Sequence, residues 1–153
     1  MAKESAGILL YRQRGGATEV FLVHPGGPFW KKKDEGAWSI PKGEANAGEE
    51  RHAAAIREFA EETGTTLGGD FRALPSIKQA GGKWVHAWAI AGDLDPATLV
   101  SNEFEMEWPP RSGKRVRFPE VDRGAWFALD EARNRINKGQ AALLDSLAAL
   151  LAG

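Results

Sequence analysis

The sequence predicts a single α/β domain over residues 1–153, and three observations lead to this fold class. A chain of 153 residues has the ordinary size of one domain that buries its own core. Strand-like runs of β-branched and aromatic residues occur in both halves of the chain, and segments with a helical period separate or follow them. No internal repeat, low-complexity tract or linker divides the chain.

The first half of the chain contains an expected hairpin and two loops. Residues 5–12 and 19–24 are expected strands, and the Gly-Gly pair between them indicates a tight turn. Residues 25–38 are rich in Gly, Pro, Lys and aromatics without a steady period, which predicts a long irregular loop. Loops of this length in compact domains tend to be functional. A short strand at 38–40 and a second loop at 41–50 are expected to follow.

A helix is expected from near Gly48 to Thr63, with Gly64 well placed to end it. The alternation after residue 102 puts Phe104, Met106 and Trp108 on one face of a half-buried strand. The remaining expected elements are strands at 83–90, 103–108 and 125–129 and helices at 130–138 and 140–151.

Composition excludes several classes of protein. The formal net charge is −1, so the bulk charge predicts neither a nucleic-acid partner nor a membrane partner. The absence of cysteine excludes a disulfide framework, a thiolate zinc site and a cysteine nucleophile. The first residues do not form a signal peptide, and Asp145 interrupts the apolar C-terminal segment, so we expect a cytoplasmic protein without a membrane span.

The expected helix carries a cluster of acids. At 100° per residue, Glu58, Glu61 and Glu62 share one face of this helix. The opposite side is expected to pack against the protein through Ala53, Ile56 and Ala60. On the acidic side, Ala54 and Ala55 are expected to leave room for a ligand to approach the carboxylates.

A solvated acidic surface is the ordinary alternative, because exposed like charges one helical turn apart cost only about 0.2–0.5 kcal/mol. If the face is partly buried, carboxylates about 6 Å apart repel by roughly 3 kcal/mol at an effective dielectric near 20. A positive group must then lie among them. Either Arg57 or a bound divalent cation meets this need, because hard cations favour oxygen ligands.

The spacing around the acids matches a known signature. The pattern consists of the acids together with fixed residues on both sides of them: Gly43, Glu49, Arg57, Glu58, Glu61, Glu62 and Gly64. It resembles the signature box of the Nudix hydrolases, which cleave nucleoside diphosphates linked to a further group. Phe59 and Thr65 depart from the aliphatic residues usual at two positions of the box. The resemblance implies an α/β/α sandwich with a mixed sheet, in which the box forms a loop, a helix and a loop.

The resemblance also implies roles for individual residues. Glu58, Glu61 and Glu62 are the implied ligands of Mg²⁺ or Mn²⁺ and are expected to share the catalytic work, and the carbonyl of Gly43 is a further candidate ligand. Arg57 is expected to orient the carboxylates by charge-assisted hydrogen bonds. Glu49 is expected to support the site, either by pairing with Arg57 or by reaching an outer cation.

Many members of the family take a further glutamate from a loop before a late Trp-containing strand, either as a metal ligand or as a general base. Glu120 is our candidate for that catalytic position, since Trp126 follows it closely. Its rivals are three glutamates of one expected strand, Glu103, Glu105 and Glu107.

Aromatic and basic residues near the box are the candidates for substrate binding. Trp30, Trp38 and Lys42 are expected to stack a base and hold phosphate charge. The alternative is that the tryptophans belong to the core and the nearby lysines, 31–33, to a solvated loop. A second basic stretch, 111–117, is interpreted as solvated surface. His24 and His86 receive no role.

The stretch WSIPKGE, residues 38–44, is similar to the diadenosine polyphosphate hydrolase branch of the family. We therefore expect metal-dependent hydrolysis of a pyrophosphate bond in a nucleotide, leaning to dinucleoside polyphosphates, by a monomer or homodimer. A nucleoside triphosphate pyrophosphohydrolase, an inositol-pyrophosphate hydrolase and a non-catalytic nucleotide-binding domain remain open. The intact set of acids favours an enzyme, because a domain that only binds has no need of them.

Overall fold

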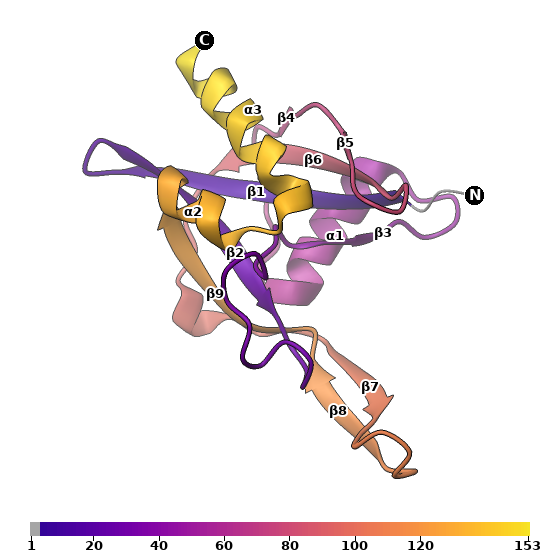
Figure 1. Ribbon diagram of the computed structural model, residues 1–153. Coiled ribbons are helices and arrows are strands. Elements are labelled where there is room, and N and C mark those ends of the chain that lie inside the picture. The colour runs from indigo at the N-terminus through magenta and orange to yellow at the C-terminus, as the bar shows by residue number, and fades with distance from the viewer. Residues whose placement is uncertain (1–3) are drawn as a thin grey trace.

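The computed structural model describes residues 4–153 and has an α/β/α arrangement (Figure 1). A mixed sheet of seven strands lies between helix α1, Arg51–Thr63, and helices α2 and α3, Leu129–Arg135 and Ala141–Ala152. This arrangement confirms the fold class predicted from the sequence.

The central strands of the sheet follow the order β4-β6-β1-β2-β9. Strand β1 is antiparallel to β2 and parallel to β6, and β2 is antiparallel to β9, so the sheet is mixed. The short β3 pairs with β1, and the short β4 and β5 pair with β6. The bounds are β1 Glu4–Arg14, β2 Ala17–Pro25, β3 Lys42–Glu44, β4 Arg72–Ala73, β5 Ile77–Lys78, β6 Trp84–Ala91 and β9 Val121–Ala128.

Two apolar layers cover the two faces of the sheet. Because neighbouring side chains of a strand point to opposite faces, Ile8 of β1 belongs to the layer under α1 and Leu9 to the layer under α2 and α3. Phe59 is fully buried in the first layer, so the aromatic residue at this position of the box packs without exposure. Leu143 and Leu144 of α3 are fully buried in the second layer.

A separate hairpin projects from the body of the molecule (Figure 1). It pairs β7, Glu103–Glu107, with β8, Arg115–Pro119, and neither strand joins the main sheet. The predicted strand at 103–108 is confirmed. The basic stretch at 111–117 is mostly exposed, as interpreted, and its last three residues begin β8. The arginines of β8 lie opposite the glutamates of β7, and Arg115 donates to Glu105 at 2.9 Å, so the charges support the pairing.

Other boundaries differ from the predicted ones for local reasons. Residues 38–40 form only two isolated bridges, Ser39 with Val23 and Trp38 with Ile136. The loop predicted at 41–50 contains β3, and α2 ends at Arg135, three residues early. The 3-10 turn η2, Lys138–Gln140, follows because the Asn137 side chain accepts from the N–H of Gly139. A second such turn, η1, spans Pro96–Thr98.

Helix α1 ends where predicted. Gly64 has φ 81°, a left-handed conformation that glycine adopts readily, and its N–H donates to the carbonyl of Ala60. Within residues 4–153, no helix combines the length and apolar character needed to cross a bilayer.

Candidate active site

Helix α1 turns Glu62 and its small alanines toward the sheet, which corrects part of the packing predicted from the sequence, while Ile56 packs against the core as expected. Ala54 and Ala55 are fully buried against the sheet, whereas Ala53, which was expected to pack, is exposed. The small alanines let the helix lie close to β1 and do not clear room for a ligand. Glu62, on the same side, is only 7% exposed, so the acids form part of the interior of the site.

Arg57 holds the acids in place. Its guanidinium donates to Glu58 at 2.9 Å, to Glu61 at 2.6 Å and to both carboxylate oxygens of Glu49, at 2.9 and 3.0 Å. A further bond reaches the carbonyl of Glu44 at 3.1 Å. A forked cation of this kind fixes the direction of several carboxylates at once. The orienting contacts expected of Arg57 are therefore present.

Glu49 pairs with Arg57, which is one of the two arrangements left open by the sequence. It also accepts from the backbone N–H of Asn46 at 2.9 Å. The hydrogen bond from Arg57 holds the pKa of Glu49 below its usual value. Glu49 thus stays ionised and fixes the far end of the guanidinium.

Gly43 lies directly against the carboxyl group of Glu58. A Cβ added to Gly43 would overlap that carboxyl group, although the backbone there is outside the left-handed region. Glycine is therefore required for space and not for backbone conformation. Burial raises the pKa of Glu58, opposed by its bond to Arg57.

Glu62 is the most strongly perturbed acid of the site. Burial, followed by the charges of Glu58 and Glu120, raises its pKa to about 8, while Lys42 opposes the shift. The pKa of Lys42 is lowered in turn, chiefly by burial. Burying carboxylates among like charges costs folding free energy. Such groups are therefore expected mainly where a function requires them.

The structure brings Glu120 to the other acids. The N–H of Glu120 donates to the carbonyl of Asn102, whose own N–H donates to the carbonyl of Glu61, each at 2.8 Å. This link fixes the start of β9 at the C-terminal end of α1. Burial, together with the charge of Glu61, raises the pKa of Glu120.

The rivals of Glu120 lie on the projecting hairpin. Glu105 pairs with Arg115, and Glu107 accepts from the backbone N–H groups of Arg111 and Gly113. Glu103 is exposed and lies 3.9 Å from Arg117. Their side chains therefore serve the hairpin itself.

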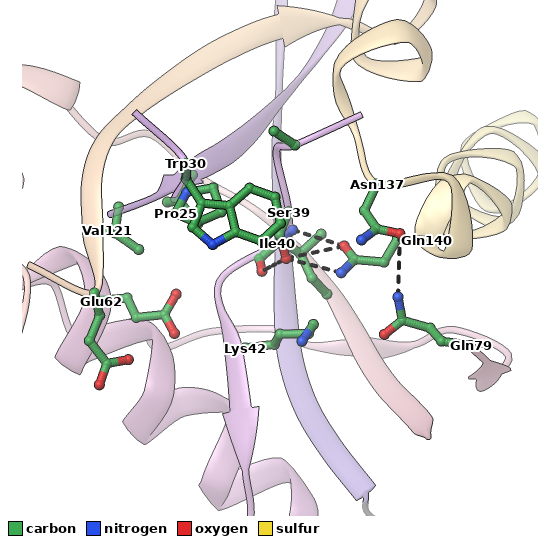
Figure 2. A pocket seen from close by; sticks show the side chains of 13 residues that line it. Pro25, Trp30, Ser39, Ile40, Lys42, Glu62, Gln79, Val121, Asn137 and Gln140 are labelled. Carbon is green, nitrogen blue, oxygen red and sulfur yellow. Dashed lines mark hydrogen bonds between the residues drawn. The ribbon is translucent and has the colours of Figure 1, made fainter. Parts of the chain in front are cut away.

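A cleft of about 250 Å³ opens beside the acids. Trp30, Lys42, Glu62 and Glu120 line it, so four of the predicted residues meet there. Figure 2 shows Glu62 on one side, the amides of Gln79 and Asn137 on the other, and the ring of Trp30 along the wall between them.

The sequence reasoning missed the three amides that line the cleft. Gln79 directly follows β5, whereas Asn137 caps and Gln140 ends the same 3-10 turn, η2, and no pattern in the sequence marks the three amides. Gln140 is 1% exposed and accepts from the N–H of Ile40 at 3.1 Å. It therefore fixes the segment that leads into Lys42.

Trp38 does not lie where a substrate could stack on it, which corrects the prediction that grouped it with Trp30. It is 3% exposed and packs edge-on against Phe127, with ring centroids 5.0 Å apart. Its indole N–H donates to Asp34 at 2.8 Å. The core alternative therefore holds for Trp38, whereas Trp30 is 37% exposed and faces the cleft.

This difference predicts opposite outcomes for two alanine substitutions. Trp38→Ala is expected to lower the free energy of unfolding by about 3–5 kcal/mol, the usual cost of emptying a buried aromatic site. Trp30→Ala is expected to lower the free energy of unfolding by clearly less than Trp38→Ala, because Trp30 is 37% exposed, and to weaken nucleotide binding. Urea unfolding and calorimetric titration with a nucleotide measure the two effects. Equal loss of stability in both variants would contradict the assignment.

The chemistry of the acids fits a hard divalent cation. Glu58, Glu62 and Glu120 supply only oxygen, and each has a pKa raised first of all by burial. Gly43 leaves open the space that a side chain would fill beside Glu58. Within residues 4–153, no three acidic or histidine side chains already converge as a closed ligand set. Binding of a cation would therefore draw the carboxylates together.

Comparison with known proteins identifies related chains. A family model described as NUDIX domain matches residues 1–147. Putative nudix hydrolase 1 of Caenorhabditis elegans is 35% identical over 79 residues, which cover 52% of this chain and 20% of that protein. The match thus spans about a fifth of the length of this curated relative.

Solved structures share the fold. The C. elegans Ap4A hydrolase in a binary complex aligns with a TM-score of 0.69 and 24% identity over 99% of both chains. The NUDIX domain of Shewanella oneidensis NrtR, complexed with ADP ribose, aligns with a TM-score of 0.69 and 14% identity over 99% of this chain and 89% of that one. These likenesses establish the fold.

Proposed function

The chain belongs to the Nudix family, and we propose that it is a divalent-metal-dependent pyrophosphohydrolase acting on a nucleoside diphosphate linked to a further group. The observation that carries this proposal is that Glu62 and Glu120 line one cleft and that the charge of Glu58 acts on Glu62, with burial raising the pKa of all three acids. A domain that only binds a nucleotide has no use for acids held at this cost.

Glu58, Glu61 and Glu62 would hold the cation, and the Gly43 carbonyl is a further oxygen at the same place. When bound, Mg²⁺ or Mn²⁺ stabilises charge on the phosphate oxygens and lowers the pKa of a water. Arg57 holds the carboxylates of Glu58 and Glu61 close to each other by donating a hydrogen bond to each.

Glu120 is the proposed general base. Its carboxylate would take the proton of the water that attacks phosphorus, and a pKa raised above its usual value by burial suits that role. Lys42 lies in the same cleft and would bind a phosphate oxygen, while the Trp30 ring would stack on the nucleobase. The amides of Gln79 and Asn137 would hydrogen-bond the edge of that base.

We assign dinucleoside polyphosphates as the substrate class. The stretch at residues 38–44 supports this, as does the likeness in fold to the Ap4A hydrolase. A nucleoside triphosphate pyrophosphohydrolase would use the same acids and differ in the groups that bind the leaving nucleotide.

A substrate panel tests the proposal. The purified protein is incubated with diadenosine tetra-, penta- and hexaphosphate, dNTPs, ADP-ribose and nucleotide sugars, with Mg²⁺ or with a chelator. We expect hydrolysis of the dinucleoside polyphosphates that the chelator abolishes and that added Mg²⁺ restores. A protein inert on the whole panel would refute the enzymatic function, and hydrolysis of dNTPs alone would refute the substrate class.

A further inference from the structure

A second hollow lies on the other side of the loop that carries Trp30. It has a volume of about 490 Å³, within the range of pockets that hold small molecules. The loop contributes Pro28 and Lys31, and the projecting hairpin contributes Trp108 and Phe118. None of these residues belongs to the proposed active site.

Aromatic contacts hold the walls of this hollow together. The Phe29 and Trp108 rings meet edge-on with centroids 5.4 Å apart, which joins the loop to the hairpin. Phe104 lies so close to Gly27 that an added Cβ would be 3.0 Å from its ring. Phe104 also packs near Phe118, with centroids 6.0 Å apart. The hollow is therefore built by packed rings and is not a gap between mobile segments.

The hollow and the active-site cleft share their dividing wall. Trp30 lines the cleft and its neighbour Lys31 lines the hollow, so the two spaces are one residue apart along the loop. The same division occurs on the facing segment, where Glu120 lines the cleft and Pro119 lines the hollow. The N–H of Gly26 donates to the carbonyl of Glu120 at 2.9 Å and ties the two segments together.

The loop that contributes to both spaces carries three consecutive lysines, residues 31–33, which we call the lysine crest, and Lys31 lines the hollow. Lys31, Lys32 and Lys33 are all exposed, and within residues 4–153 none of them forms an ion pair with a carboxylate. Lys33 places its ammonium 5.1 Å from the centre of the Trp30 ring. Lys31 lines the hollow one residue from Trp30 in the cleft, although Asp122 also lines the hollow. A positively charged segment beside two spaces that each contain a tryptophan matches a ligand with a phosphate chain between two aromatic groups.

We propose that the hollow between Lys31 and Trp108 binds the second nucleoside of a dinucleoside polyphosphate. The phosphate chain would cross the lysine crest from the cleft, and the second base would stack on Trp108. This inference rests on the proposed function and adds to it a binding site for the part of the substrate that does not react.

The test compares diadenosine tetraphosphate with adenosine 5′-tetraphosphate, which has the same phosphate chain and lacks the second nucleoside. In the wild type we expect a lower KM for the dinucleotide. Trp108→Ala is expected to raise the KM for the dinucleotide about 5- to 100-fold, the range for loss of one stacked base, with kcat and the KM for the tetraphosphate nearly unchanged. Trp84→Ala, which removes another surface tryptophan, is the matched control and should change neither KM.

A measurement on the wild type tests the second binding site even if the Trp108→Ala variant does not fold. Diadenosine tetraphosphate, added without metal, is expected to shift the Trp108 indole N–H signal in NMR spectra and to leave the Trp84 signal in place. Adenosine 5′-tetraphosphate is expected to leave the Trp108 signal in place as well. An unmoved Trp108 signal at saturation, or equal KM changes for both nucleotides in Trp108→Ala, overturns the second site while the hydrolase function stands. Failure to hydrolyse any nucleotide overturns the proposed function itself.

Discussion

Glu62→Gln is expected to stabilise the folded protein and to remove its activity. The wild-type side chain is buried among other acids, which raises its pKa to about 8. Glutamine has nearly the shape of the protonated acid and carries no charge, so it avoids the cost of burying a carboxylate. It is also a poor ligand for a hard cation, and we expect kcat/KM to fall by more than about 100-fold, the loss that supporting residues of metal sites can already cause.

The gain in stability has a defined pH dependence. Between pH 4.5 and about 8, the folded wild type keeps a proton on Glu62 that the unfolded chain has released. The unfolded state then binds fewer protons than the folded state, so the wild-type contribution to stability falls as pH rises through this window and levels off above it. At about 1.4 kcal/mol per pKa unit, the advantage of Glu62→Gln should grow from near zero below pH 4.5 to a few kcal/mol at pH 8.

Urea unfolding of both proteins with a chelator, at pH 4.5, 6, 7 and 8, measures this difference. Glu50→Gln is the matched control, because Glu50 is exposed at the N-terminal end of the same helix and its side chain makes no capping bond. An advantage that stays constant with pH, or a glutamine variant less stable than the wild type at pH 8, would contradict the assigned burial cost.

The spacing of residues predicted the helix and its acids but not the direction they face. A periodicity of 3.6 puts Glu58, Glu61 and Glu62 together whichever way the helix turns. The expectation that the side opposite the acids packs against the protein then placed Ala53 inside, although it is exposed. Ala54 and Ala55 pack instead, because only small residues let the helix approach β1 closely enough for Glu62 to reach the cleft. A functional site is where expectations of this kind tend to fail.

Contacts between distant segments could not be predicted from local patterns. Glu120 was chosen because Trp126 follows it, but its position depends on the link through Asn102 to α1. The sequence supports Trp30 and Trp38 equally as substrate-binding residues, and only the packing of Trp38 on Phe127 distinguishes them. Strand β8 is absent from the prediction because its arginines fit solvated surface, which they are, and only the pairing with β7 makes the stretch a strand.

Gly43→Ala is expected to disable the enzyme through a single methyl group. The added Cβ would overlap the carboxyl group of Glu58 and force that side chain away from its bond with Arg57. Displacement of a positioning or reacting group by about 1 Å can cost 100-fold in rate, so we expect kcat/KM to fall by at least about that factor. Gly68→Ala is the matched control, because Gly68 has ordinary φ and no atom within 4 Å of an added Cβ.

A double-mutant cycle identifies the cause. Because the overlapped atoms are the end of a side chain that can move aside, the free energy of unfolding in the wild-type background should fall only by the low end of an overpacking cost, about 1 kcal/mol. In the Glu58→Ala background the overlapping carboxyl group is absent, so Gly43→Ala should then cost little. Urea unfolding of the four proteins gives the coupling free energy between the two positions. A cost that is the same in both backgrounds would place the need for glycine in the backbone of β3, and Gly43 would then have no part in positioning Glu58.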